Sequence, residues 1–165
     1  VPDTDRDILT LAVVERHHGT GNLGLGLVQG FGLREGALAG SVAHDSHNVI
    51  AVGTSESDLC LAVETLRDLG GGLAAVRGGD VLARVPLPVG GLLSWEPIGV
   101  LVDRLDTVNR AAASLGCRLE DPFMVLSFLA LPVIPAVKLT DLGLVDVSRF
   151  SLVPLFTGEA DADDA

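Results

Sequence analysis

The chain has 165 residues, 48% of them hydrophobic, and a formal net charge of −11. This length suits one domain with a sizeable core, and the acidic balance excludes the basic patch that nucleic-acid binding requires. Two cysteines are too few for a disulfide framework, and the polar, acidic first residues are not a signal peptide. Prolines interrupt the one long apolar stretch, residues 122–137, so no membrane span is predicted. We therefore expect a cytoplasmic protein.

The spacing of apolar residues predicts both strands and helices. An aliphatic run over residues 8–15 is typical of a buried strand, and the eight glycines of residues 19–40 favour short strands and turns. Ser55 caps a predicted helix that Gly70 stops, and a turn at residues 77–80 joins the strands of a predicted hairpin. The other predicted elements are strands over residues 38–43, 49–52, 144–147 and 150–153, and helices over residues 97–115 and from Pro122 to just before Pro132.

These elements predict a single compact domain of the α/β or α+β class. It should contain a mixed sheet, two to three helices and a β-hairpin. The predicted domain spans residues 1–157, and residues 158–165 are predicted to be an acidic, disordered tail. The sequence begins at Val1, close to a predicted strand, whereas it ends in this predicted tail. We therefore expect it to be the C-terminal part of a longer protein.

All four histidines fall in two short polar clusters at predicted strand-to-loop junctions. The clusters cover residues 15–22 and 43–48 and contain His17, His18, His44 and His47. Histidine titrates, binds metals and transfers protons near neutral pH, so these clusters mark the candidate site.

The residues alone leave three interpretations of the histidines open. A metal site needs three or four converging ligands, which the clusters supply only if the two loops meet. A pair of a histidine and Asp45 would instead hydrogen-bond a substrate or orient a neighbouring site. Otherwise, backbone carbonyls and Asn48 satisfy the histidines. Residues 19–24 match the dinucleotide fingerprint GxGxxG, but no helical pattern follows, so a glycine-rich turn is favoured.

Beyond the histidine segments, residues 13–22 and 41–48, the chain contains further distinctive stretches. These are residues 69–72, 86–94, 120–135, 138–141 and 143–147. Together, in this order and over residues 13–156, they resemble the C-terminal domain of bacterial and archaeal adenine deaminases.

The resemblance implies a hydrolase of the metal-dependent amidohydrolase superfamily that converts adenine and water to hypoxanthine and ammonia in purine salvage. In that superfamily a (β/α) barrel binds the metal through an HxH pair and further ligands, and Mn²⁺ or Fe²⁺ is the implied cofactor. This chain has no HxH and is too short for a barrel of roughly 250 residues. We therefore expect the metal centre upstream, no metal ligand on this chain, and no activity of the chain alone.

The resemblance also implies a role for the histidine clusters, which we expect to cap the purine site at the barrel mouth. His44, Asp45 and His47 are the predicted accessory catalytic residues, and the predicted substrate contacts are Arg16, His17, His18, Ser46 and Asn48. The expected partners are adenine, the upstream barrel and further copies in a homo-oligomer, with neither nucleic acid nor membrane. Two alternatives stay open: a self-sufficient metal-binding protein built on the histidine clusters, and a non-catalytic packing or oligomerisation module.

Overall fold

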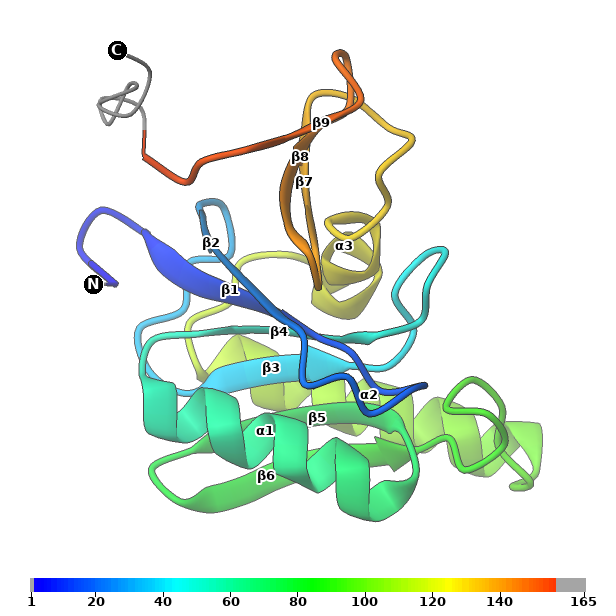
Figure 1. The fold of residues 1–165 in the computed structure, drawn as a ribbon. Coiled ribbons are helices and arrows are strands. Elements are labelled where there is room, and N and C mark those ends of the chain that lie inside the picture. Colours follow the sequence, from blue (N-terminus) through cyan, green and yellow to red (C-terminus); the bar gives the residue numbers. More distant parts are fainter. Residues whose placement is uncertain (1, 157–165) are drawn as a thin grey trace, which may run out of the picture.

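The computed structural model describes residues 2–156, and its centre is a six-stranded sheet (Figure 1). The strands lie in the order β2-β1-β4-β3-β5-β6. Their bounds are β1 Leu9–Val14, β2 Leu23–Val28, β3 Ala37–Gly40, β4 Val49–Gly53, β5 Gly72–Arg77 and β6 Asp80–Pro86. All five pairings in this sheet are antiparallel, so the predicted mixed sheet contains no parallel pair. This selects α+β from the two predicted classes.

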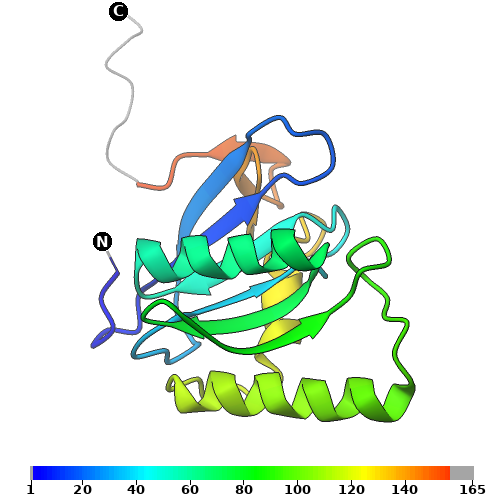
Figure 2. The same ribbon diagram turned by 90° about the horizontal axis from the view of Figure 1, so that it is seen from below.

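Two helices cover opposite faces of the sheet (Figure 2). Helix α1, Glu56–Leu69, packs on β3, β4 and β5, and helix α2, Ile98–Ser114, packs on β5 and β6. Successive side chains of a strand point to opposite faces, so Ala37 and Ala39 contribute to the core under α1 while Leu38 contributes to the core under α2. Burial on both faces explains why these strands read as continuous aliphatic runs.

The helix ends follow the capping chemistry that the sequence predicts. The Ser55 hydroxyl accepts a hydrogen bond from the Asp58 N–H at 3.2 Å, and Gly70 closes α1 in the left-handed conformation with φ 73°. Asp121 caps helix α3, Pro122–Phe128, by accepting the Met124 N–H at 3.3 Å. The three predicted helices and the β5–β6 hairpin are therefore confirmed.

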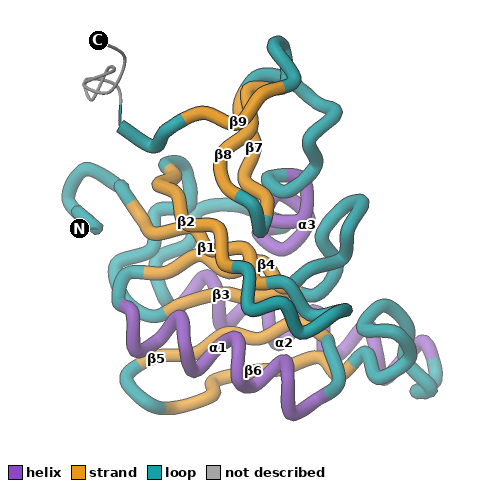
Figure 3. The backbone as a smooth tube through the Cα atoms, viewed as in Figure 1, coloured by secondary structure: helices purple, strands orange, loops and turns teal. Residues whose placement is uncertain are grey.

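A second sheet of three short strands lies beside the main one, close to α3 (Figure 3). Its strands are β7 Val137–Thr140, β8 Gly143–Asp146 and β9 Ser151–Val153, all antiparallel. The sequence predicts β8 and β9 but misses β7. That strand has only four residues and follows directly on the apolar stretch from Pro122, so its pattern does not stand out.

Strand β2 alternates leucine and glycine, and this alternation allows the second sheet to pack against it. The leucines are exposed on one face, whereas Gly24 and Gly26 are buried under the β7–β8 hairpin. A Cβ atom at Gly24 would lie 1.8 Å from the Thr140 carbonyl oxygen. The glycine-rich segment is thus a strand in which missing side chains permit close backbone approach.

Two remaining expectations concern membranes and the chain end. Within residues 2–156, no helix combines the length and apolar character needed to cross a membrane. The predicted acidic tail of residues 158–165 lies outside the described residues.

Replacing Gly24 by alanine should destabilise the domain, because the new methyl group would overlap the Thr140 carbonyl. We expect a loss of about 1–3 kcal/mol or more, the usual cost of overpacking, measured as a lower midpoint of thermal or urea unfolding. The control is Gly99→Ala on α2, where an added Cβ meets no atom within 4 Å. Equal stability of the two variants would contradict the packing argument.

Candidate functional site

Strand register brings the two histidine clusters to the same end of the main sheet. Residues 15–22 connect β1 to β2 and form the first histidine loop, and residues 41–48 connect β3 to β4 and form the second. Val14 pairs with both Leu23 and Val49. The first loop therefore starts beside the point where the second one ends.

Two side chains of the first loop hydrogen-bond the backbone of the second. The Arg16 Nε–H donates to the His47 carbonyl at 2.5 Å, and the His17 ring Nε2 lies 2.7 Å from the Ser46 carbonyl oxygen. A carbonyl can only accept, so the His17 Nε2–H is the donor in this contact. The two loops meet, as a shared site requires.

Arg16 also recruits a third segment, residues 87–97, which connects β6 to α2. Its Nη2 donates to the Gly90 carbonyl at 2.7 Å. Gly91 has φ 76°, and a Cβ there would lie 2.6 Å from the same guanidinium nitrogen. The Ser41 hydroxyl donates to the Gly91 carbonyl at 2.6 Å, which fixes this segment to the start of the second loop.

Glu15 organises the first histidine loop from within. Its side chain is only 6% exposed, and its carboxylate accepts the N–H groups of His17, His18 and Thr20 at 2.5, 2.8 and 3.1 Å. Desolvation acts to raise the pKa of Glu15, but hydrogen bonds from Thr20, His18 and His17 outweigh it and lower the pKa to about 2. Glu15 is therefore a carboxylate at any physiological pH.

Asp141, in the turn between β7 and β8, joins both histidine loops. Its carboxylate accepts the side-chain amide of Asn22 at 3.2 Å and that of Asn48 at 3.1 Å. These bonds fix which amide atom of each asparagine is nitrogen, because a carboxylate accepts only. Asp141 was not among the predicted site residues, although it belongs to the stretch 138–141 that carries the family resemblance.

His44 and His47 hold their ring centroids 5.8 Å apart in an edge-to-face arrangement. Burial lowers the pKa of His47, and the charges of His44 and Arg16 lower it further, against a smaller opposing effect of Asp45. His47 is therefore a neutral imidazole at pH 7. Its Nδ1 and the Oδ1 of Asn48 are both buried and have no hydrogen-bond partner within residues 2–156.

Helix α3 lies against the second histidine loop. The His44 N–H donates to the Ser127 carbonyl at 3.1 Å, and the His44 ring centroid lies 5.0 Å from that of Phe128. The site is thus assembled from the two histidine loops, residues 87–97, the β7–β8 turn and the C-terminal end of α3.

The predicted site residues differ in how far they are engaged. Arg16 and His17 are occupied in joining the loops, and Asn48 is 3% exposed and bonded to Asp141. The side chains of His18, Asp45 and Ser46 are exposed. Asp45 forms no hydrogen bond with a histidine ring within the described part of the chain, so the predicted histidine–aspartate pair is not formed there.

The histidines do not assemble a metal site. Within residues 2–156, no group of three or more His, Cys, Asp or Glu side chains is arranged to hold an ion. Among the donor atoms, His17 Nε2 bonds a carbonyl and the Glu15 carboxylate accepts three backbone N–H groups. His47 Nδ1 has no hydrogen-bond partner within residues 2–156, but one such atom does not make a metal site. The residues present therefore do not fit the metal that the resemblance implies.

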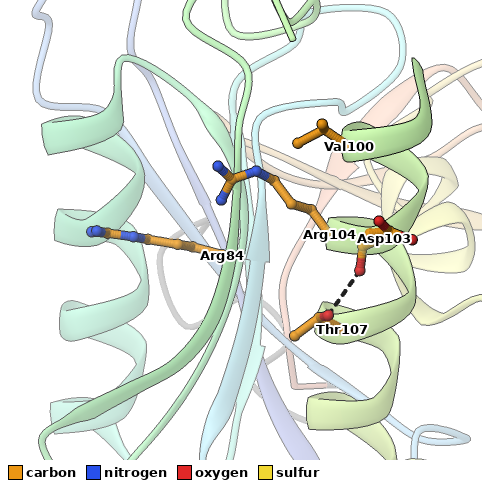
Figure 4. A pocket seen from close by; sticks show the side chains of 5 residues that line it. All are labelled: Arg84, Val100, Asp103, Arg104 and Thr107. Atoms are coloured by element: carbon orange, nitrogen blue, oxygen red, sulfur yellow. Dashed lines mark hydrogen bonds between the residues drawn. The ribbon is translucent and has the colours of Figure 1, made fainter. Parts of the chain in front are cut away.

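Two cavities are lined by other residues. One, of about 360 Å³, lies between β6 and α2 and is lined by Arg84, Val100, Asp103, Arg104 and Thr107 (Figure 4). Arg104 is paired there with Glu96 at 2.6 Å, so its charge is already balanced. The other, of about 650 Å³, is a mainly apolar groove between α1 and strands β1 and β2. Neither includes a predicted site residue.

The low pKa of Glu15 predicts a specific dependence of stability on pH. A carboxyl group with a depressed pKa stabilises the fold above its unfolded value of 4.5 and loses this contribution as pH falls toward about 2. Glu15→Gln should therefore lower the melting temperature at pH 7, and the difference from the wild type should shrink steadily between pH 5 and pH 2.

The control for that series is Glu64→Gln, which removes an exposed carboxylate from α1. Its melting temperature should follow that of the wild type across the whole range. A constant gap between Glu15→Gln and the wild type would contradict the proposed role of the Glu15 carboxylate.

Comparison with known proteins places this chain in a family. The family model of the adenine deaminase C-terminal domain matches residues 1–151. The chain is 57% identical over 153 residues to the adenine deaminase of Dehalococcoides mccartyi and 58% identical over 154 residues to that of Desulfatibacillum aliphaticivorans. It is 56% identical over 156 residues to the adenine deaminase of Methanothrix thermoacetophila.

These alignments cover 93%, 93% and 94% of this chain and 27% of each relative. The chain thus spans about a quarter of the length of the curated relatives it matches. The matched region includes both histidine loops and the β7–β8 turn. On the strength of the family match over residues 1–151, the chain belongs to the adenine deaminase C-terminal domain family.

Proposed function

We propose that this chain is the C-terminal domain, residues 1–157, of an enzyme that hydrolyses adenine to hypoxanthine and ammonia. The observation that carries the proposal is the convergence of the two histidine loops, joined by Arg16 and His17, at one end of the sheet. The names of the relatives supply the reaction. In this proposal the joined loops cap the purine site of an upstream catalytic domain.

The chemistry of the loops suits a purine edge, which carries both hydrogen-bond donors and acceptors. His47 is neutral and can accept or donate a proton, and His44 lies beside it. We assign accessory catalytic roles to His44, Asp45 and His47, and contacts with adenine to His18 and Ser46. Arg16, His17 and Asn48, which are engaged within the chain, act by holding these groups in position.

The metal of the reaction, Mn²⁺ or Fe²⁺ in this proposal, would be bound by the upstream domain, where it would activate water. The residues of this chain would orient adenine and exclude bulk water from it. Removal of the amino group from adenine suits purine salvage in the cytoplasm, and we place the enzyme there as a homo-oligomer.

One observation favours a second function, the packing module. The groove between α1 and strands β1 and β2 is bordered by the exposed leucines of β2. Exposed apolar patches of this kind commonly bind another protein surface. A packing role for this face is compatible with a cap role for the histidine loops, because the two surfaces are formed by different residues.

The proposal predicts that the 165-residue chain alone releases no ammonia from adenine, with or without added Mn²⁺. The longer enzyme that contains this domain should do so under the same conditions and is the positive control. Turnover by the isolated chain, or near-stoichiometric metal bound to it in elemental analysis, would instead support the self-sufficient metal-binding alternative.

Replacement of His47 or His44 by alanine in the longer enzyme should reduce kcat by roughly 10²-fold or more, the usual contribution of a positioned acid–base group. The melting temperature should change little. Arg110→Ala, on the exposed surface of α2, is the matched control and should leave both quantities unchanged. If activity stays near the wild-type value while the melting temperature falls, the loop is structural and the cap proposal is wrong.

A further inference from the structure

Helix α3 has apolar side chains on its outer face as well as on the face it buries. Phe123 and Leu126 are 7% and 0% exposed and anchor the helix in the core. Met124 and Phe128, four residues apart and therefore neighbours on the helix surface, are 50% and 39% exposed. Met124 and Phe128 therefore present apolar surface on the side of the helix that faces away from the core.

Phe128 adjoins the candidate site directly. Its ring centroid lies 5.0 Å from that of His44, with the two ring planes inclined by 45°. The hydrogen bond from the His44 N–H to the Ser127 carbonyl, 3.1 Å long, fixes the helix end relative to the second histidine loop. An exposed aromatic ring is thus held in a defined position beside a cluster of polar side chains.

An aromatic ring beside polar side chains is complementary to a flat heteroaromatic base. Such a base is apolar on its two faces and carries hydrogen-bonding atoms only around its edge. A site that binds it needs an apolar wall for one face and polar groups for the edge, placed at right angles to each other. The histidine loops supply polar groups, and the outer face of α3 supplies an apolar surface next to them.

We propose that Phe128, supported by Met124, is the wall on which the purine ring of the substrate stacks. This inference rests on the proposed function and adds to it the residues that recognise the purine face. It assigns Phe128 to substrate binding rather than to the chemical step, so its loss should appear in KM and not in kcat. If an apolar side chain of the upstream domain covered Phe128 instead, the substitutions at this position would give different KM values.

The test compares Phe128→Ala, Phe128→Leu and Phe128→Tyr in the longer enzyme, assayed with adenine. The alanine variant should raise KM roughly tenfold, as expected for the loss of one base–aromatic stack, and leave kcat within about twofold. The tyrosine variant retains the ring and should keep a KM near that of the wild type. The leucine variant keeps an apolar side chain but lacks the ring, so its KM should resemble that of the alanine variant.

Val125→Ala, on the same helix and 40% exposed, is the control and should leave KM unchanged. An unchanged KM in Phe128→Ala, a fall in kcat alone, or full recovery in Phe128→Leu would overturn the stacking role; the last result would indicate contact with another apolar surface. If the histidine variants lose activity while Phe128→Ala does not, only this inference fails. If the longer enzyme does not deaminate adenine, both the proposed function and this inference fail.

Discussion

The link of Asp141 to the candidate site depends on the close contact between Gly24 and the Thr140 carbonyl, a contact that exists only because residue 24 has no side chain. This contact sets the depth at which the β7–β8 hairpin packs on β2. The turn of that hairpin then places Asp141 between Asn22 and Asn48, one from each histidine loop. A missing methyl group on an edge strand thus allows Asp141 to reach both loops, which strand pairing and the bonds from Arg16 and His17 already bring together.

Side chains, rather than regular secondary structure, satisfy the polar backbone of the two loops. Glu15 accepts three N–H groups of the first loop, and Arg16 donates to carbonyls of two other segments. These hydrogen bonds with charged side chains order loops of irregular shape at the end of the sheet. In a chain with a net charge of −11, the guanidinium of Arg16 is used internally and forms no basic surface.

Local patterns predicted the elements well because their causes are local. The Ser55 cap, the Gly70 stop and the leucine periodicity of α1 act within a few residues. The histidine clusters marked a candidate site from the sequence alone, and the structure brings the two loops that carry them together. Strand β7 and the role of Asp141 had no local signal, since each depends on packing against β2. Sequence also could not distinguish Arg16 and His17, which bond backbone carbonyls, from His18, which is exposed.

The hydrogen bonds within the loops have an energetic consequence for the proposed cap role. Ordering a flexible loop around a ligand costs conformational entropy at the moment of binding, and this cost weakens affinity. Here Glu15, Arg16 and Asp141 order both loops when the domain folds, before any substrate is present. His44 and Phe128 are fixed by the same framework through the bond from His44 to Ser127. In the cap role proposed above, a domain built in this way would present ordered loops to the purine, and its binding energy would serve discrimination between bases rather than loop ordering.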